Sequence, residues 1–398
     1  MVFQTKHSTL TRGVVLALLL LTAAPASGQV SFELLELPGN GRWADFSLSD
    51  DGQQMGCLLD GAVYWWAASH GFRFLDAGSP TLAGVGMSAG GNAMIAARKT
   101  PAGTVPTIWY RDGSSVELGL VPDKCRVESH ADSGYDLSGD GSIAVGQGTS
   151  CDAAVGFIWS RAVGLHTVPL VVGADSRATA VSGSGQTVVG FCEHPTSGYR
   201  RPVVWQDESA PQFFLGEATA GEAHNVSLDG RYVVGQAEMG GLSPQAFFWS
   251  VGQEPISLGN LSGRGTDASQ ATSVANDGKV VGWSGDEFSE SQEAFIWTAQ
   301  TGTQALADVA VAGGVTLPTG LRLTRALDIS GDGSTVVGVC RDKYWNQLYW
   351  RMHLGAEALV ATTNRKPHPM PPPLVMPDSV DIHQADMMNP FPFGKRRN

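Results

Sequence analysis

The stretch SLDGRYVVG, residues 227–235, decides the fold because close copies of it recur along the chain. Its Asp-Gly pair supplies a tight turn in which glycine accepts a positive φ, and Ser227 is expected to tie back to that turn. The apolar run that follows is typical of a strand returning as a hairpin partner. The copies are SGDGSIAVG from residue 138, SGSGQTVVG from 182, ANDGKVVG from 275 and SGDGSTVVG from 330. The chain is therefore expected to be an array of β-hairpins.

A second marker gives the length of the repeat. Each hairpin is followed by an apolar segment that ends in tryptophan, and these are Trp65, Trp109, Trp159, Trp205, Trp249, Trp297 and Trp350. The turn glycines are also seven: Gly52, Gly91, Gly141, Gly185, Gly230, Gly278 and Gly333. From Gly52 to Gly333 the chain advances by 281 residues over six intervals, and from Trp65 to Trp350 by 285. Both markers therefore give a period of about 47 residues.

The unit at residues 223–259 contains four strands joined by turns: AHNVS, RYVVG, QAFFWS and PISLG. Because side chains alternate across a strand, Val233 and Val234 must face opposite sides of this sheet. A sheet with two apolar faces must be stacked between others, and four strands in about 40 to 50 residues are the pattern of a β-propeller. The sequence therefore predicts an all-β fold, a seven-bladed β-propeller of four-stranded antiparallel blades over residues 29–355. An open β-solenoid is the alternative, but its coils are usually shorter and need polar caps.

The two ends of the array are expected to meet in one blade. The seventh unit has three clear strands but only the weak LGAEALV, residues 354–360, where a fourth should stand. The segment FELLELPGN from residue 32 resembles a fourth strand. Phe32–Leu37 is therefore predicted to be the outer strand of the last blade, which closes the ring and removes an open edge. A strand-like linker is the alternative.

Residues 1–28 have the pattern of a secretory signal peptide. Lys6 and Arg12 precede the apolar run VVLALLLLTAA, and the small residues of APASG precede a cleavage near Gln29. The alternative is a membrane anchor, but the run is shorter than the roughly 20 residues of a spanning helix. Residues 356–398 hold 8 of the 21 prolines, which predicts a flexible tail. The protein is expected to be secreted, extracellular or periplasmic, with no membrane span.

The charge balance disfavours some partners. The formal net charge is −12, and no basic stripe interrupts the acidic composition. A surface of this sign repels phosphates, so neither nucleic acid nor an anionic lipid surface is expected as a partner. The expected partner is an extracellular protein or glycan, and the chain is expected to be a monomer.

Five cysteines in an exported chain leave at least one unpaired. Cys125 and Cys151 lie in polar, turn-rich surroundings that flank one strand pair, and a disulfide between them is predicted. Cys57, Cys192 and Cys340 come just after the glycine of an apolar strand, where small buried thiols are expected. The sequence lacks the Cys and His spacings of a metal site and implies no cofactor.

The segments AFFW at 246, AFIW at 294 and GFIW at 156, with VVG-type strands upstream and SLGN downstream, resemble those of the bacterial extracellular HAF-repeat proteins. The resemblance covers nearly all of residues 41–351 and implies exported repeats without a well-defined reaction. The chain departs from the family at Gln245 and Glu293, which stand where the histidine of His-Ala-Phe would be. More distantly, the pattern resembles kelch repeats, whose paired glycines are missing here.

A propeller can gather unlike side chains at the mouth of its central channel, where the loops entering the first strands meet. Five polar residues in first strands are predicted to line this funnel: Arg177, Glu222, His224, Gln270 and Arg325. The arginine fork can bind a carboxylate or a sugar there, although solvated charges are the plainer interpretation. Glu222 and His224, two residues apart on one strand, can share a face as an acid/base pair.

Two functions follow from these residues. The first hypothesis is a non-catalytic propeller that binds a protein or glycan through one face of the ring. The alternative is an extracellular hydrolase or lyase with its site at the central funnel, around Glu222, His224 and Arg325. The sequence marks no nucleophile or second carboxylate that would complete a reaction.

Overall fold

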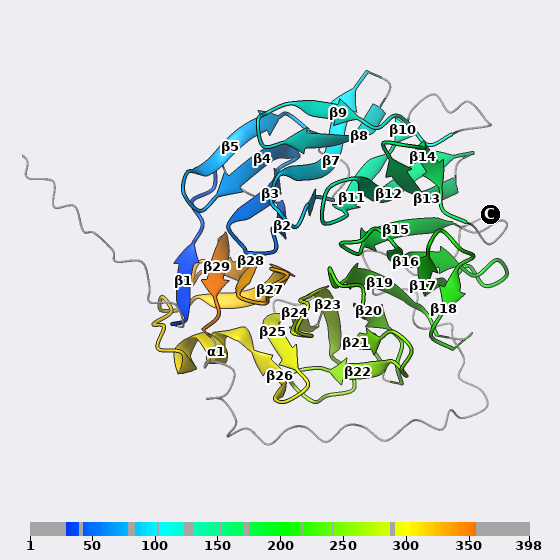
Figure 1. The fold of residues 1–398 in the computed structure, drawn as a ribbon. Coiled ribbons are helices and arrows are strands. Elements are labelled where there is room, and N and C mark those ends of the chain that lie inside the picture. Colours follow the sequence, from blue (N-terminus) through cyan, green and yellow to red (C-terminus); the bar gives the residue numbers. More distant parts are fainter. Residues whose placement is uncertain are drawn as a thin grey trace, which may run out of the picture.

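The recurring hairpins form the inner strands of seven sheets that radiate from a central axis (Figure 1). The computed structural model describes residues 29–39, 43–78, 84–101, 103–122, 130–151, 153–169, 175–216, 219–240, 242–286 and 291–355. Six sheets have four antiparallel strands, and one has a fifth strand. The predicted all-β, seven-bladed propeller is confirmed. The predicted signal peptide, residues 1–28, and the predicted tail, residues 356–398, lie outside the described residues.

In each blade the first strand lies nearest the axis and the last strand lies at the outer edge. Blade 1 comprises β2 (Ala44–Leu48), β3 (Gln54–Leu59), β4 (Ala62–Ala67) and β5 (Gly71–Asp76). Blade 2 comprises β6 (Gly86–Met87), β7 (Ala93–Thr100), β8 (Gly103–Tyr110) and β9 (Ser115–Glu117), and β10 (His130–Ala131) pairs with β8 in parallel. Blade 3 comprises β11 (Ser133–Leu137), β12 (Ile143–Ser150), β13 (Ala153–Ser160) and β14 (Gly164–Thr167). Blade 4 comprises β15 (Ser176–Val181), β16 (Thr187–Glu193), β17 (Arg200–Gln206) and β18 (Gln212–Phe213).

The remaining blades follow the same plan. Blade 5 comprises β19 (Gly221–Val226), β20 (Tyr232–Ala237), β21 (Gln245–Ser250) and β22 (Ile256–Gly259). Blade 6 comprises β23 (Ala268–Val274), β24 (Val280–Gly285), β25 (Glu293–Thr298) and β26 (Gly302–Ala305), and the short helix α1 (Leu306–Ala312) follows it. Blade 7 comprises β27 (Arg322–Ile329), β28 (Thr335–Arg341), β29 (Gln347–His353) and β1 (Ser31–Leu34).

The amino-terminal strand closes the ring, as predicted. β1 pairs antiparallel with β29, with Phe32 opposite Met352, so strands from the two ends of the array share blade 7 (Figure 1). The rings of Phe32 and Trp350 are stacked with their centroids 6.3 Å apart. The regular strand ends at Leu34 rather than at Leu37, although the backbone N–H of Leu35 still donates to the carbonyl of Tyr349 at 2.8 Å.

Both faces of each blade are buried against its neighbours. Val233 and Val234 of β20 are fully buried in two different apolar cores, one shared with blade 4 and the other with blade 6. The described residues form seven such cores, one at each junction between blades. The seven repeat tryptophans are all buried. The blades stack around the axis, so the apolar side chains on both faces of each sheet are buried against the neighbouring blades.

The hairpin turns meet in a ring at one end of the central channel. At six junctions a turn N–H donates to a backbone carbonyl of a neighbouring turn at 2.7–3.1 Å, and at the seventh Asp229 N donates to Asn276 Oδ1 at 3.0 Å. Leu228 reaches across the ring, so a Cβ added to Gly331 would lie 2.6 Å from its Cδ1. Ser227 ties back to its turn as predicted, donating to Asp229 at 2.7 Å. This end of the channel therefore has a structural role.

Replacing Phe32 by alanine is expected to lower the free energy of unfolding by about 2 kcal/mol, because the ring packs on Trp350 and on the core between blades 6 and 7. Phe74→Ala is the matched control, since Phe74 stands on the outer strand of blade 1 and is 57% exposed. Its replacement should cost less than about 1 kcal/mol. Urea unfolding followed by tryptophan fluorescence measures both. Equal losses would show that β1 adds no stability to the ring.

Candidate functional site

A β-bulge in the first strand of blades 3 to 7 sets the direction of the funnel side chains. In blade 5 the register shifts between Ala223 and Asn225, so His224 is the extra residue. The bulge places the carbonyl of Glu222 against Gly235, where an added Cβ would lie 2.0 Å from that oxygen. The same approach, at 1.9–2.2 Å, recurs between Gly146 and Ser133, Gly190 and Arg177, Gly282 and Gln270, and Gly338 and Arg325. The bulge therefore explains why the second strand of each of these hairpins has glycine at this position.

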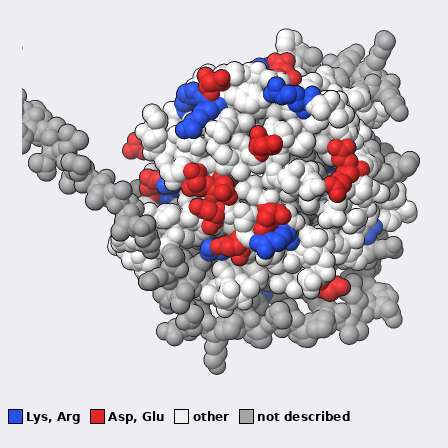
Figure 2. Space-filling model, in the orientation of Figure 1, with Lys and Arg blue, Asp and Glu red and all other residues white. Residues whose placement is uncertain are grey.

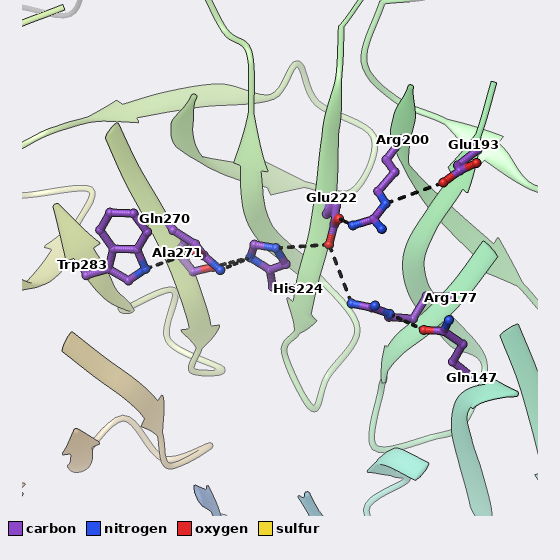
Figure 3. Close-up of polar contacts among 9 residues, drawn as sticks. All are labelled: Gln147, Arg177, Glu193, Arg200, Glu222, His224, Gln270, Ala271 and Trp283. Carbon is purple, nitrogen blue, oxygen red and sulfur yellow. Dashed lines mark hydrogen bonds and ion pairs between the residues drawn. The ribbon is translucent and has the colours of Figure 1, made fainter. Parts of the chain in front are cut away.

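Glu222, near the start of β19, is the centre of a buried ionic cluster (Figure 3). Its side chain is only 9% exposed. Oε1 accepts a hydrogen bond of 2.5 Å from Arg200 Nη1. Oε2 lies 4.0 Å from Arg177 Nη1 and 3.8 Å from His224 Nε2. Both carboxylate oxygens are therefore occupied by groups from blades 4 and 5.

The two arginines of the cluster are themselves held in place (Figure 3). Arg177 Nε donates to Gln147 Oε1 at 2.7 Å, which extends the contacts to blade 3. Arg200 Nε lies 3.8 Å from Glu193 Oε1. Both guanidinium groups lie over the ring of Phe191, at 5.2 Å for Arg177 and 4.5 Å for Arg200. These cation–π contacts place both guanidinium groups against an apolar ring and restrict the orientation of their planes.

His224 is oriented by a chain of contacts from blade 6 (Figure 3). Trp283 Nε1 donates to Gln270 Oε1 at 3.1 Å, and because an indole N–H can only donate, this bond orients the Gln270 amide. Gln270 Nε2 then faces His224 Nδ1 at 3.1 Å, and it donates to that nitrogen when the neutral ring carries its proton on Nε2, toward Glu222. The carbonyl of Ala271 also lies 3.1 Å from Nδ1, and it accepts from that nitrogen when Nδ1 carries a proton, in the other neutral tautomer or in the protonated ring.

Arg325 in blade 7 joins this chain from the other side. Its guanidinium lies over the ring of Trp283 at 5.2 Å, and its Nε donates to Gln292 Oε1 at 2.7 Å. The structure thus brings Arg177, Glu222, His224 and Gln270 together through direct polar contacts, and it connects Arg325 to them through the face of Trp283.

At neutral pH the cluster holds an ionised carboxylate beside a neutral imidazole. Burial opposes the ionisation of Glu222, but the charges of Arg177 and Arg200 outweigh it and lower the pKa of the carboxyl group. Burial lowers the pKa of His224, although the Glu222 carboxylate opposes this. A carboxylate held as an anion by two arginines does not donate a proton readily. The arrangement is therefore better suited to a fixed pattern of charge than to proton transfer.

Sequence reasoning missed three members of the cluster: Arg200, Gln147 and Trp283. We call the first-strand position of Arg177, Glu222, Gln270 and Arg325, which Ser133 occupies in blade 3, the funnel position. A register rule could have found two of the three residues, because the residue after each VVG-type glycine pairs across the hairpin with the funnel position. Trp283 is opposite Gln270, and Gln147 is opposite Ser133. Arg200 begins the third strand of blade 4 after a loop whose length varies between repeats, so no fixed spacing marks it.

Polar side chains that stand three residues after the funnel position in the first strands link neighbouring blades. Asp328 Oδ2 accepts from Leu48 N at 2.7 Å, and its Oδ1 accepts from Ser273 Oγ at 2.5 Å. Asp136 Oδ2 accepts from Val181 N at 2.9 Å. Similar contacts join Ser47 Oγ to Met87 N at 3.0 Å and Asn225 Oδ1 to Val274 N at 3.3 Å. These bonds hold five of the seven blade junctions near the axis.

The carboxyl groups along the channel titrate unusually. Burial raises the pKa of Asp45 and of Asp136 to about 7 and that of Asp328 to about 6. The charge of Asp328 adds to the rise at Asp45 and Asp136, despite hydrogen bonds from backbone N–H groups that lower both values. In the described part of the chain, no three His, Cys, Asp or Glu side chains are placed to hold a metal ion.

Three of the cysteines are buried thiols, as predicted: Cys57, Cys192 and Cys340. Burial raises the pKa of Cys340 to about 12, which suppresses its reactivity. Cys151 is disulfide-bonded. Its predicted partner Cys125 lies outside the described residues, so this pairing stays a prediction.

The ring face seen in Figure 2 carries acidic side chains near its centre, with basic side chains beside some of them and uncharged residues over most of the remaining surface. Acidic groups at the centre of this face oppose the approach of a phosphate backbone. Among the helices of the described residues, none has the length and apolar character to cross a bilayer.

Comparison with known proteins identifies the class through the fold alone. Neither a protein-family model nor a curated protein matches the sequence. The β-propeller domain of the Trilobed protease from Pyrococcus furiosus, which has an open velcro topology, is similar with a TM-score of 0.51 and 11% identity, over 78% of this chain and 94% of that one. Oligogalacturonate lyase in complex with manganese is similar with a TM-score of 0.50 and 13% identity, over 84% of this chain and 99% of that one. The chain is thus a β-propeller, here closed by pairing of β1 with β29.

Replacing Glu222 by glutamine is expected to lower the free energy of unfolding by about 2–3 kcal/mol, because Arg177 would lose its carboxylate partner and Arg200 the nearer of its two. Glu208→Gln is the matched control, since that carboxylate is exposed and pairs with His166, and its loss should cost less than about 0.5 kcal/mol. Denaturant unfolding at pH 7 compares the two. A neutral effect at Glu222 would show that the cluster is not stabilised by this anion.

Replacing Asp136 by asparagine is expected to flatten the pH dependence of stability. The folded-state pKa of about 7 lies above the ordinary value, so the contribution of Asp136 is complete below about pH 4 and is lost as the pH rises through 7. The stability of Asp136→Asn relative to wild type should therefore rise by about 2.5 kcal/mol between pH 5 and pH 8. The amide oxygen can still accept from Val181 N, as Asn225 accepts from Val274 N.

Thermal and urea unfolding of both proteins across this pH range measures the difference. Asp207→Asn is the control, because Asp207 is exposed and asparagine tolerates its positive φ of 49°. Parallel pH profiles for wild type and Asp136→Asn would rule out a raised pKa at this position.

Proposed function

We propose that this protein is a secreted, non-catalytic β-propeller that binds an extracellular protein or glycan through the funnel face of the ring. The hairpin turns occupy the opposite end of the channel, where backbone bonds join them around the axis. Glu222 stands at the start of β19, and the turn that contains Ser227 follows the end of that strand. The funnel face is therefore the end of the channel that carries a varied set of polar side chains.

The observation that carries this proposal is the state of Glu222. Both of its oxygens are engaged by Arg200, Arg177 and His224, and its pKa is lowered. A general acid at this position would need a raised pKa and a proton to give. The cluster instead presents fixed hydrogen-bond donors and a guanidinium fork, which suit recognition of a carboxylate or a polyhydroxylated ligand.

The alternative is an extracellular hydrolase or lyase with its site around Glu222, His224 and Arg325. The observation in its favour is the neutral imidazole of His224, whose Nε2 lies 3.8 Å from Glu222 Oε2. A neutral imidazole can accept a proton from a substrate if its ring turns toward the funnel. We rank this function second because the lowered pKa of Glu222 provides no complementary acid.

Secretion is supported by the signal-like pattern of residues 1–28, with cleavage near Gln29. Membership of the HAF-repeat proteins is supported by the AFFW, AFIW and GFIW segments and their VVG-type strands. Amino-terminal sequencing of protein recovered from the medium or periplasm tests the cleavage directly.

Binding to an array of extracellular proteins and glycans tests the proposed function. A ligand of the funnel should lose about tenfold or more in affinity with Arg177→Ala or Arg325→Ala, since each removes one guanidinium of the funnel set. Arg161→Ala is the matched control, because Arg161 bonds the exposed Tyr110 hydroxyl on the outer part of the ring. Ligands whose affinity is unchanged by both funnel variants would contradict a funnel site. Turnover of an arrayed glycan would favour the enzyme instead.

A further inference from the structure

The loop between β28 and β29 presents two large aromatic rings to solvent. Tyr344 is 71% exposed and Trp345 is 43% exposed, whereas the seven repeat tryptophans are buried. Large aromatic side chains are normally buried on folding, so two adjacent exposed rings indicate a contact surface. We call residues 342–346 the aromatic loop.

The aromatic loop is rigid because Asp342 organises its backbone. The Asp342 carboxylate accepts from Tyr344 N at 2.8 Å, from Asn346 N at 2.9 Å and from Asn346 Nδ2 at 2.8 Å. Trp345 N donates to the Asp342 carbonyl at 3.0 Å. Trp345 has a φ of 68°, a left-handed conformation that is unfavourable for a bulky side chain. The rings are thus held outward by a local network that accepts backbone strain.

Cationic side chains surround the two rings. The Arg322 guanidinium lies 5.7 Å from the centre of the Trp345 ring, and Lys343 Nζ lies 4.9 Å from that of Tyr344. Arg341 Nη1 donates to the carbonyl of Trp345 at 3.2 Å. In the part of the chain that the structure describes, no ion pair within 4 Å ties these three cations to a carboxylate. With three cations and one carboxylate, that of Asp342, the surface is locally positive on a chain whose net charge is −12.

The aromatic loop belongs to the funnel face. Arg322 begins β27, the strand that carries Arg325 three residues later, and Arg322 pairs across the hairpin with Arg341. The aromatic loop directly follows Arg341, so it stands at the same end of blade 7 as the funnel position. A ligand that spans this end of blade 7 can contact both Arg325 and the aromatic loop.

We propose that the aromatic loop binds a carboxylated oligosaccharide. The C–H faces of a sugar ring carry partial positive charge and pack on the negative faces of Tyr344 and Trp345. The sugar carboxylates pair with Arg322, Arg341 and Lys343, which gives the charge complementarity that a neutral glycan lacks. This inference rests on the proposed binding function and names a ligand class for its face.

Alginate oligosaccharides, which carry one carboxylate on each sugar ring, are the probe for the full chain by calorimetry at low salt. Dextran of the same length supplies sugar rings without charge, and poly-glutamate supplies carboxylates without sugar rings. Alginate should bind about tenfold or more tightly than either polymer, and its affinity should fall as sodium chloride is raised.

Trp345→Gly is the decisive variant because glycine adopts a φ of 68° without strain, so the variant should fold at least as stably as wild type. It should nevertheless lose about tenfold in alginate affinity, and Arg322→Ala should lose about threefold. Phe74→Ala and Arg231→Ala are the matched controls, since both remove exposed side chains from other parts of the ring and should leave the affinity unchanged.

The inference is overturned if alginate does not bind, or if Trp345→Gly binds it as tightly as wild type. Equal binding of poly-glutamate would overturn it in favour of an acidic protein partner. The funnel proposal fails separately: it requires an arrayed ligand whose affinity falls with Arg177→Ala, whereas the aromatic loop requires alginate binding that falls with Trp345→Gly.

Discussion

The structure depends on the burial of both faces of every second strand. Val233 and Val234 are adjacent in β20, and each is fully buried in a different core. One isolated sheet cannot bury both faces, so each blade is stable only between two others. A row of such sheets would leave two apolar faces at its ends, whereas a ring leaves none. Closure by β1 is therefore a consequence of the side-chain pattern, and the covalent ends of the array meet in the blade where that closure occurs.

A glycine within the second strand of blades 3 to 7 connects this packing to the funnel. It allows the carbonyl of the funnel residue to approach within van der Waals contact, as Gly235 does for Glu222 and Gly282 does for Gln270. The adjoining bulge changes the side-chain alternation, so a residue such as His224 is added to the strand without a cross-strand partner. The recurring hairpin that identifies the fold therefore also determines where the polar residues of the first strands converge.

The sequence was sufficient to predict the blade count and the closing strand, because these follow from local alternation and from a constant period. It named Arg177, Glu222, His224 and Gln270 as funnel candidates, but the contacts that join them are known only from the structure. It was not sufficient for Arg200, whose approach to Glu222 depends on a loop of irregular length between β16 and β17. The link from Arg325 to the cluster through Trp283 was also missed, since stacking across blades leaves no spacing to read. Contacts between repeats are thus harder to predict than the repeats themselves.

Perturbed carboxyl groups often mark catalytic sites, but two of the three in this channel, Asp136 and Asp328, have a structural explanation. Asp136 and Asp328 accept backbone N–H groups from the next blade, and Asn225 and Ser47 make equivalent contacts without an ionisable group. The position thus requires a hydrogen-bond acceptor and not a proton, and the raised pKa values follow from placing carboxylates where burial penalises their charge. Glu222 differs because two arginines compensate its burial. Acidic residues near the axis therefore have two different roles: Asp136 and Asp328 join neighbouring blades, and Glu222 is a buried anion whose charge is compensated by two arginines.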